Sequence, residues 1–139
     1  PETANLKAWN PPPYSGKAYR VFAFNTDVVM MGLLDLMPVW NRTNLAKINL
    51  TTGKVEGLNP VISGYSPKVN SLACSGDTLF VGGSGILKIN GVGAGNLCAL
   101  DAGSGSLLSG FVPPQLDGEV SALFKKGNYL YSGGSFKTV

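Results

Sequence analysis

An internal repeat of about 50 residues constrains this chain more than any other feature of its sequence. The segments 69–83 and 120–134 carry Val, Leu, Gly, Leu and Gly-Gly at matching places, without a gap and 51 residues apart. A less similar copy covers 21–32. It begins 48 residues before Val69 and predicts a turn that is two residues shorter. Self-similarity at a fixed period of this length is typical of repeat architectures such as solenoids and propellers.

Two further motifs follow the same spacing. The segment 44–55 matches 96–107, which begins 52 residues later. A large apolar residue two places before a proline then ends each copy, in Trp9-Asn-Pro11, Leu58-Asn-Pro60 and Phe111-Val-Pro113. Three independent anchors at one spacing predict a repeat array.

Each copy has the pattern of short strands joined by tight turns. Leu79–Val81 and Tyr129–Tyr131 are apolar or aromatic, and Ser75-Gly-Asp77 and Lys126-Gly-Asn128 have the composition of hairpin turns. A third strand and an outer strand follow, which makes four strands in about 50 residues, the content of one propeller blade. The 19 glycines and 9 prolines of the 139 residues fit such a turn-rich β protein.

The predicted fold is therefore all-β, with propeller-type blades of four antiparallel strands, and residues 1–139 form a single segment of it. The pattern is least clear over 33–40, where a loop or a short helical turn is expected. The expected parts are a trailing outer strand at 5–10, blade 1 at 21–60, blade 2 at 69–113 and a partial blade 3 at 120–139.

About two and a half blades cannot close a ring, because propellers close with roughly 4–8 blades. We therefore expect either the remainder of a longer chain or a homo-oligomer. A trimer is favoured, since three copies would bring six complete blades. The first residue, Pro1, is neither an initiator Met nor part of a secretory signal, so we expect a mature product or an excised fragment.

The repeat resembles the delta-60 type of β-propeller repeat found in bacterial secreted and surface proteins. The likeness is clear over 57–139 and weaker over 5–56. It implies a propeller fold at the cell surface or outside the cell, and it brings no shared catalytic motif. The residues that carry it are 69–83, Asn90-Gly-Val92, 96–107, Phe111-Val-Pro113 and 120–136.

Charge and composition argue against several functions. Charged residues make up 14% of the chain against a usual share of about 25%, and the net charge of +3 is scattered. A nucleic-acid surface would need a basic stripe, so we expect no nucleic-acid partner. The chain has no His, the commonest general base and transition-metal ligand, and we expect no catalysis, cofactor or metal. No apolar run approaches the ~18 residues of a membrane span.

The two cysteines, Cys74 and Cys98, are predicted to lie on strands that a third strand separates. Two strand spacings amount to roughly 9–10 Å, which exceeds the usual Cα separation of a disulfide. We expect two free, buried thiols.

Two other motifs are interpreted as structural. Asp101-Ala-Gly-Ser-Gly105 faintly resembles a calcium loop but lacks further acids, so a turn is the better interpretation. Gly91-Val-Gly-Ala-Gly95 lacks the spacing of a phosphate loop and is interpreted as an inter-strand loop. Glycosylation sequons at Asn41 and Asn49 are a weak hint of a secreted protein.

Aromatic residues are the remaining candidates for binding. Trp9 occupies the repeated position before a proline and is expected in the core. Tyr14, Tyr19, Trp40 and Tyr65 are expected in variable connections, where their rings can stack on a sugar or contact a partner protein. The sequence thus favours a non-catalytic recognition or adhesion module, secreted or at the cell surface, which binds a glycan or a protein. The alternative is a structural propeller fragment of a larger secreted enzyme or surface protein.

Overall fold

The structure is a computed structural model that describes residues 14–24, 27–36 and 44–139. All regular elements in these ranges are β-strands and all named pairings are antiparallel, which confirms the predicted all-β class. The strands are β1 (Tyr14–Phe24), β2 (Asp27–Leu36), β3 (Asn44–Asn49), β4 (Ile62–Ser75), β5 (Thr78–Ile89), β6 (Val92–Gly93), β7 (Leu97–Asp101), β8 (Val120–Lys126) and β9 (Tyr129–Gly134).

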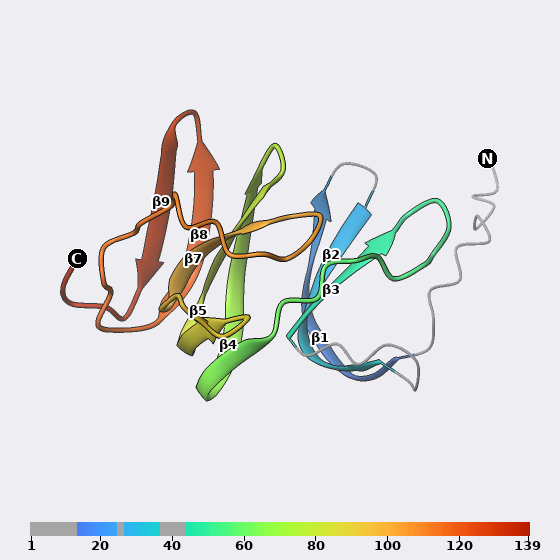
Figure 1. Ribbon diagram of the computed structural model, residues 1–139, viewed down its shortest axis with the longest axis horizontal. Coiled ribbons are helices and arrows are strands. Elements are labelled where there is room, and N and C mark those ends of the chain that lie inside the picture. Colours follow the sequence, from blue (N-terminus) through green and yellow to red (C-terminus); the bar gives the residue numbers. More distant parts are fainter. Residues whose placement is uncertain (1–13, 25–26, 37–43) are drawn as a thin grey trace, which may run out of the picture.

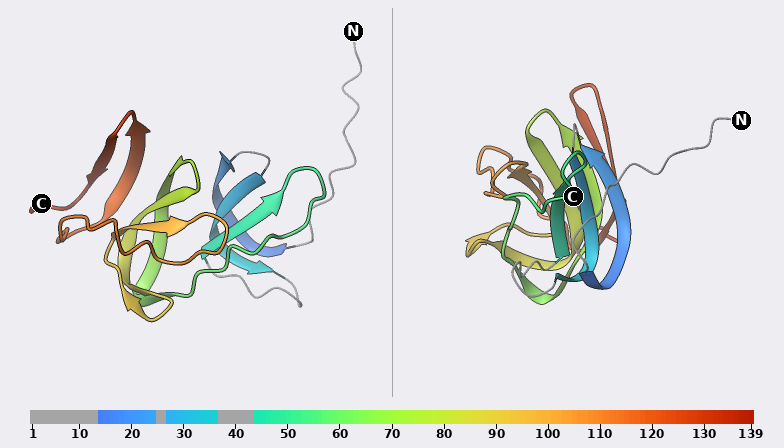
Figure 2. Two further views of the ribbon diagram at one scale, coloured as in Figure 1. Left: turned by 45° about the horizontal axis from the view of Figure 1, so that its top comes forward. Right: turned by 90° about the vertical axis from the view of Figure 1, so that its right-hand side faces the viewer.

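The strands form three small sheets that lie in an open row (Figure 1). The first sheet has the order β1-β2-β3, the second joins β4, β5, β6 and β7, and the third is the β8–β9 hairpin. A quarter turn of the molecule places the sheets one behind another (Figure 2). Below, unit 1 denotes residues 14–55, unit 2 residues 62–107 and unit 3 residues 120–134.

Each of the first two units contains three main strands and one further bridge. In both, the third strand pairs with the second strand of the hairpin, β3 with β2 and β7 with β5. The expected fourth, outer strand consists of a single antiparallel bridge, Ile48 to Val55 in unit 1 and Leu100 to Leu107 in unit 2. These two bridges are 52 residues apart, as are the sequence motifs that contain them.

From the turn to just beyond the bulge, the register of the hairpins places the three units 51 residues apart; units 1 and 2 differ further along, where Gly64 pairs with Ile86. Val21 pairs with Met30, as Leu72 pairs with Val81 and Leu123 with Ser132. The sequence prediction that aligned Val21 with Val69 and shortened the first turn is therefore wrong. Two residues separate the paired strands at the turn of every hairpin. The turn glycines Gly76 and Gly127 have positive φ angles, which confirms the two hairpin turns predicted there.

At one position in each unit, a close backbone contact leaves no room for any residue other than glycine. Gly32, Gly83 and Gly134 lie 51 residues apart, and a Cβ atom at any of them would collide with a backbone carbonyl oxygen of the paired strand. That oxygen belongs to Lys17, Lys68 and Glu119 respectively. Because backbone cannot rotate away as a side chain can, these positions tolerate only glycine without a shift of the sheet.

A β-bulge also recurs at the same place. The register shifts between Ala18 and Arg20, and again 51 and 102 residues later. Bulges bend a strand and raise its twist, so each hairpin curves in the same way. The unpaired residues at the three bulges are Tyr19, Asn70 and Ser121.

The main core lies between the first two sheets. Side chains alternate along a strand, so each sheet offers one face to the sheet before it and one to the sheet after it. Val29, Met31 and Leu45 of unit 1 pack in one cluster with Leu72, Leu79, Val81 and Leu100 of unit 2. A second cluster, Val28, Met30, Ala46 and Ile48, lies on the opposite face of the first sheet.

The third sheet packs on the second through β8. The space beside Gly82 is filled by the side chains of Val120 and Leu123. The N–H of Leu123 donates to Ser71 Oγ over 2.9 Å. At the bulge, Asn70 Nδ2 donates to Glu119 Oε1 (2.9 Å) and more weakly to the Val120 carbonyl (3.3 Å). Apolar packing and three hydrogen bonds therefore fix this sheet against its neighbour.

Several boundaries differ from the sequence predictions. The first strands of units 1 and 2 begin at Tyr14 and Ile62, seven residues before the expected starts at Val21 and Val69. Within 33–40, residues 33–36 belong to β2, and 37–40 lie outside the described residues. Trp9 and the expected strand at 5–10 also lie outside them. β6 was not expected, and it uses two residues of the Gly91–Gly95 segment.

The cysteines lie on two strands that a third separates, as predicted, and both are free. Cys74 is on β4 and Cys98 on β7, with β5 between them. Cys98 is buried, and burial raises the pKa of its thiol to about 12; Cys74 is half-buried, and burial raises its pKa to about 11. Both thiols are therefore protonated and unreactive at neutral pH.

Candidate binding surfaces

The structure places the predicted aromatic candidates on strands rather than in connections. Tyr14 begins β1, Tyr19 lies at the bulge of β1, and Tyr65 lies in β4. The expected position in variable connections is therefore wrong for these three, while Trp40 lies outside the described residues. Tyr14 and Tyr65 are 51 residues apart in the sequence, but their positions differ: Tyr14 pairs with Leu36 in unit 1, whereas Tyr65 lies where the pairing of β4 with β5 is interrupted.

Tyr65 stands on an irregular part of β4. The pairing with β5 is interrupted between Gly64 and Lys68, and Ser66 has a positive φ of 47°. On the facing strand Gly85 lies against the Tyr65 carbonyl oxygen, where a Cβ atom would collide with it. The local backbone projects the tyrosine outward, and 83% of the residue is exposed. A large ring held at this exposure by fixed backbone geometry is a surface available for contact.

Tyr19 lies at a different kind of backbone position. It occupies the bulge position that Asn70 occupies in unit 2. There the residue bonds to the next sheet through Glu119 and Val120. The position is thus one of contact between sheets in unit 2, whereas the position of Tyr65 faces solvent.

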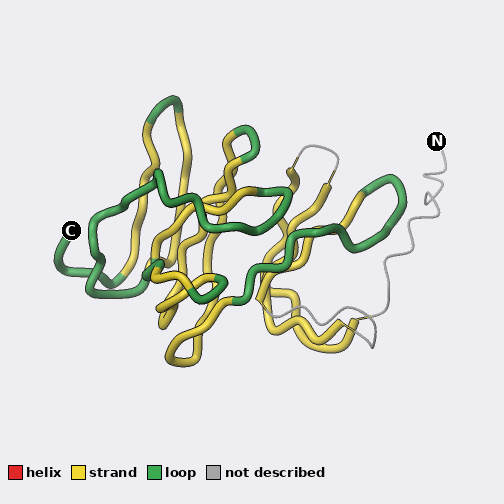
Figure 3. The backbone as a smooth tube through the Cα atoms, in the orientation of Figure 1, coloured by secondary structure: helices red, strands yellow, loops and turns green. Residues whose placement is uncertain are grey.

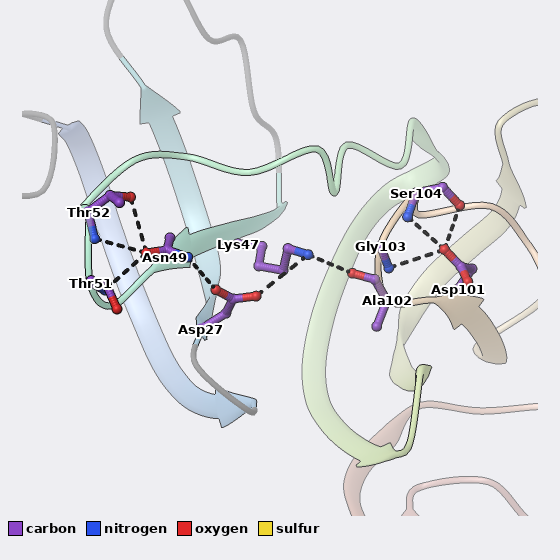
Figure 4. Close-up of polar contacts among 9 residues, drawn as sticks. All are labelled: Asp27, Lys47, Asn49, Thr51, Thr52, Asp101, Ala102, Gly103 and Ser104. Atoms are coloured by element: carbon purple, nitrogen blue, oxygen red, sulfur yellow. Dashed lines mark hydrogen bonds and ion pairs between the residues drawn. The ribbon is translucent and has the colours of Figure 1, made fainter.

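Polar contacts between units 1 and 2 centre on Lys47 (Figure 4). Its Nζ lies 3.7 Å from Asp27 Oδ2 and donates to the Ala102 carbonyl over 3.3 Å. Asp27 also accepts from Asn49 Nδ2 over 3.3 Å. These side chains join β2 and β3 to the loop after β7, so they connect the two sheets.

The segment that resembled a calcium loop is a turn held by Asp101. Asp101 Oδ1 accepts from the N–H groups of Gly103 (3.1 Å) and Ser104 (2.7 Å) and from Ser104 Oγ (2.8 Å). Asn49 Oδ1 accepts in the same way from Thr51 and Thr52 in unit 1 (Figure 4). The predicted turn is confirmed, and the described residues contain no cluster of three or more His, Cys, Asp or Glu side chains suited to a metal.

These hydrogen bonds predict an acid-dependent stability. Donation by the Ser104 N–H, then by its hydroxyl, lowers the pKa of Asp101 below its ordinary value. A carboxylate with a lowered pKa stabilises the fold above its unfolded pKa, and this contribution is lost as the pH falls through the folded pKa. We expect Asp101→Asn to keep the turn, since Asn49 holds the same turn with an amide. Its melting temperature should then approach that of the wild type as the pH is lowered.

Thermal melts from neutral to acid pH measure this difference. Asp101→Ala is the matched control, because it removes the acceptor and should lower the melting temperature at every pH. An Asp101→Asn variant whose deficit stays constant down to acid pH would contradict a role of the ionised carboxylate.

The Gly91–Gly95 segment borders a pocket of about 260 Å³. The other wall is the segment from Leu107 to Leu116 after the second unit, which the loop trace shows as part of the long connection from β7 to β8 (Figure 3). None of the described residues that line it is charged. The Gly91–Gly95 segment contains strand β6, so its interpretation as an inter-strand loop is wrong for Val92 and Gly93.

One surface that sequence reasoning missed is the aromatic face of the β8–β9 hairpin. Phe124, Tyr129 and Tyr131 are 62%, 71% and 55% exposed. Their ring centroids are 6.3 Å apart for Phe124 and Tyr131 and 6.4 Å for Tyr129 and Tyr131. Alternation along the paired strands could have placed them on one face, but it could not show that this face is open.

Comparisons with known proteins add no further assignment. No family model, curated protein or solved structure matches the chain. The part of the chain that the structure describes has no helix that is long and apolar enough to cross a membrane.

Proposed function

We propose that the chain is a non-catalytic recognition or adhesion module, secreted or at the cell surface, which binds a glycan or a surface protein. Its units are proposed to be propeller-type blades, in line with the resemblance to the delta-60 repeat. The ring would be completed by further copies of the chain, three in the arrangement that we favour, or by the remainder of a longer chain. The common register of the three hairpins supports this architecture.

The observation that carries the proposal is the exposed tyrosine of unit 2, Tyr65. Tyr65 is held outward by the irregular β4 backbone. A rigid aromatic ring contributes contact area at a low cost in conformational entropy and can stack on the apolar face of a sugar.

A glycan array followed by calorimetry on the hits tests the proposal. We expect Tyr65→Ala to weaken binding about tenfold, because an aromatic contact contributes about 1.4 kcal/mol. Tyr65→Phe keeps the ring and should retain most of the affinity. Val112→Ala changes another exposed apolar residue and serves as the matched control. An array without hits, or equal affinity of Tyr65→Ala and wild type, would contradict the role of this tyrosine.

A further inference from the structure

The face of unit 3 that carries Phe124, Tyr129 and Tyr131, here called the open face, has a counterpart in each preceding unit. By the 51-residue register, Tyr131 corresponds to Phe80 and Val29, and Phe124 corresponds to Ala73 and Phe22. Every unit thus directs the same pair of opposed positions to the side away from the unit before it.

These counterparts are covered in units 1 and 2. Val29 is fully buried in the core cluster shared with unit 2, and Phe22 packs against that cluster. Ala73 is buried, and Phe80 is half-buried with its ring edge-on to Phe111 at a centroid distance of 5.2 Å. The sheet that follows in the row covers Val29 and Phe22, while Phe80 packs against Phe111 of the connection between β7 and β8. At unit 3 both positions are exposed and both carry aromatic side chains.

The covering contacts between units 2 and 3 show what kind of surface this face accepts. Val120 and Leu123 of β8 fill the space beside Gly82, and Ser71 accepts the Leu123 N–H. Gly133 and Ala122 occupy the positions of Gly82 and Ser71 on the open face. A Cβ atom at Gly133 would meet nothing within 4 Å, so the space that a neighbouring sheet fills in unit 2 is empty in unit 3.

One edge of the same hairpin is also open. β2 and β5 each pair with a third strand of their own unit, β3 and β7. Among the described residues β9 pairs only with β8, so its other edge keeps unpaired backbone N–H and C=O groups. An open edge beside an exposed apolar face is a surface that a β-sheet covers better than a small ligand does.

We propose that the open face is an assembly interface that binds a second copy of this chain, sheet against sheet. This inference rests on the assembly included in the proposed function and names its surface. It does not depend on ligand binding through Tyr65. Three aromatic side chains of 150–250 Å² each supply an apolar patch of a few hundred Å², which is the centre of an interface rather than its whole extent.

Light scattering coupled to size-exclusion chromatography, over a wide range of concentrations of the whole chain, tests the inference. We expect an oligomer for the wild type and a monomer for Phe124→Ser/Tyr131→Ser, with the dissociation constant raised about thirtyfold or more. Tyr65→Ser, which alters an exposed ring on another unit, should assemble as the wild type does. Circular dichroism should show the same fold for all variants, because the exchanged side chains are exposed.

Hydrogen exchange of the wild type keeps the test valid even if the double variant folds poorly. Peptides covering 120–134 should be protected at high concentration and lose protection on dilution. A monomer at every concentration, an oligomer that persists in a folded double variant, or a monomer whose open face binds a glycan would each overturn the inference. Loss of glycan binding by Tyr65→Ala in an intact oligomer concerns the proposed function alone.

Discussion

Replacement of Gly83 by alanine is expected to lower the free energy of unfolding by about 3 kcal/mol, the upper part of the range for overpacking a well-filled site. An added Cβ would collide with the Lys68 carbonyl oxygen and would lie 2.7 Å from Ile86 Cδ1. The side chain of Ile86 is buried and has little room to move, and the carbonyl belongs to the paired strand. Relief therefore requires β4 and β5 to separate at the centre of unit 2. Chemical denaturation followed by circular dichroism measures the effect.

Gly93→Ala is the control for this substitution, since a Cβ at Gly93 would meet nothing within 4 Å. A second matched pair lies in unit 3, where Gly134 faces the Glu119 carbonyl oxygen and its neighbour Gly133 faces open space. Gly134→Ala should destabilise while Gly133→Ala should not. Equal stabilities within either pair would mean that the glycine is not required by the contact, and the common register would lose its steric explanation.

The same steric difference explains why the sequence alone predicts the wrong alignment of unit 1 with units 2 and 3. Unit 2 has Gly82-Gly83 and unit 3 has Gly133-Gly134, so in the sequence both glycines of the pair resemble a fixed part of the repeat. The structure shows that the second glycine is blocked in all three units. The first glycine of the pair lies on the sheet face that is directed to the next sheet. In unit 1 Met31 occupies this position, and its side chain fills the space on that face. Alignment on Val21 followed a common residue instead of the one required by geometry.

The extent of the prediction follows from what a local pattern contains. The turn composition around Gly76 and Gly127 and the period of the motifs are local features. They predict the hairpins and the strand that separates Cys74 from Cys98. The bulges, the early start of β4 and the open face depend on how one sheet meets the next. Such contacts between distant segments leave no short motif. The sequence therefore predicts only that the aromatic residues of β8 and β9 lie on strands. For Tyr65 it predicts a connection, whereas the residue lies in β4.

Leu79→Ala is expected to have an effect of comparable size, lowering the free energy of unfolding by about 2–5 kcal/mol. Leu79 is fully buried on β5, faces unit 1 and belongs to the cluster that joins the first two sheets. Its removal takes apolar contacts from both sheets and leaves a cavity, because strands held by pairing on both edges of β5 cannot close over it.

Leu87 provides the matched control, since it lies on the same strand and is 49% exposed. Leu87→Ala should change the unfolding free energy by less than about 1 kcal/mol, as expected for a surface site. Denaturant titration of both variants also tests how the units depend on one another. If units 1 and 2 are one cooperative body, Leu79→Ala shifts a single transition to lower denaturant with an unchanged slope. If each unit unfolds by itself, the variant would instead split the transition, and the core between the sheets would not be what holds the row together.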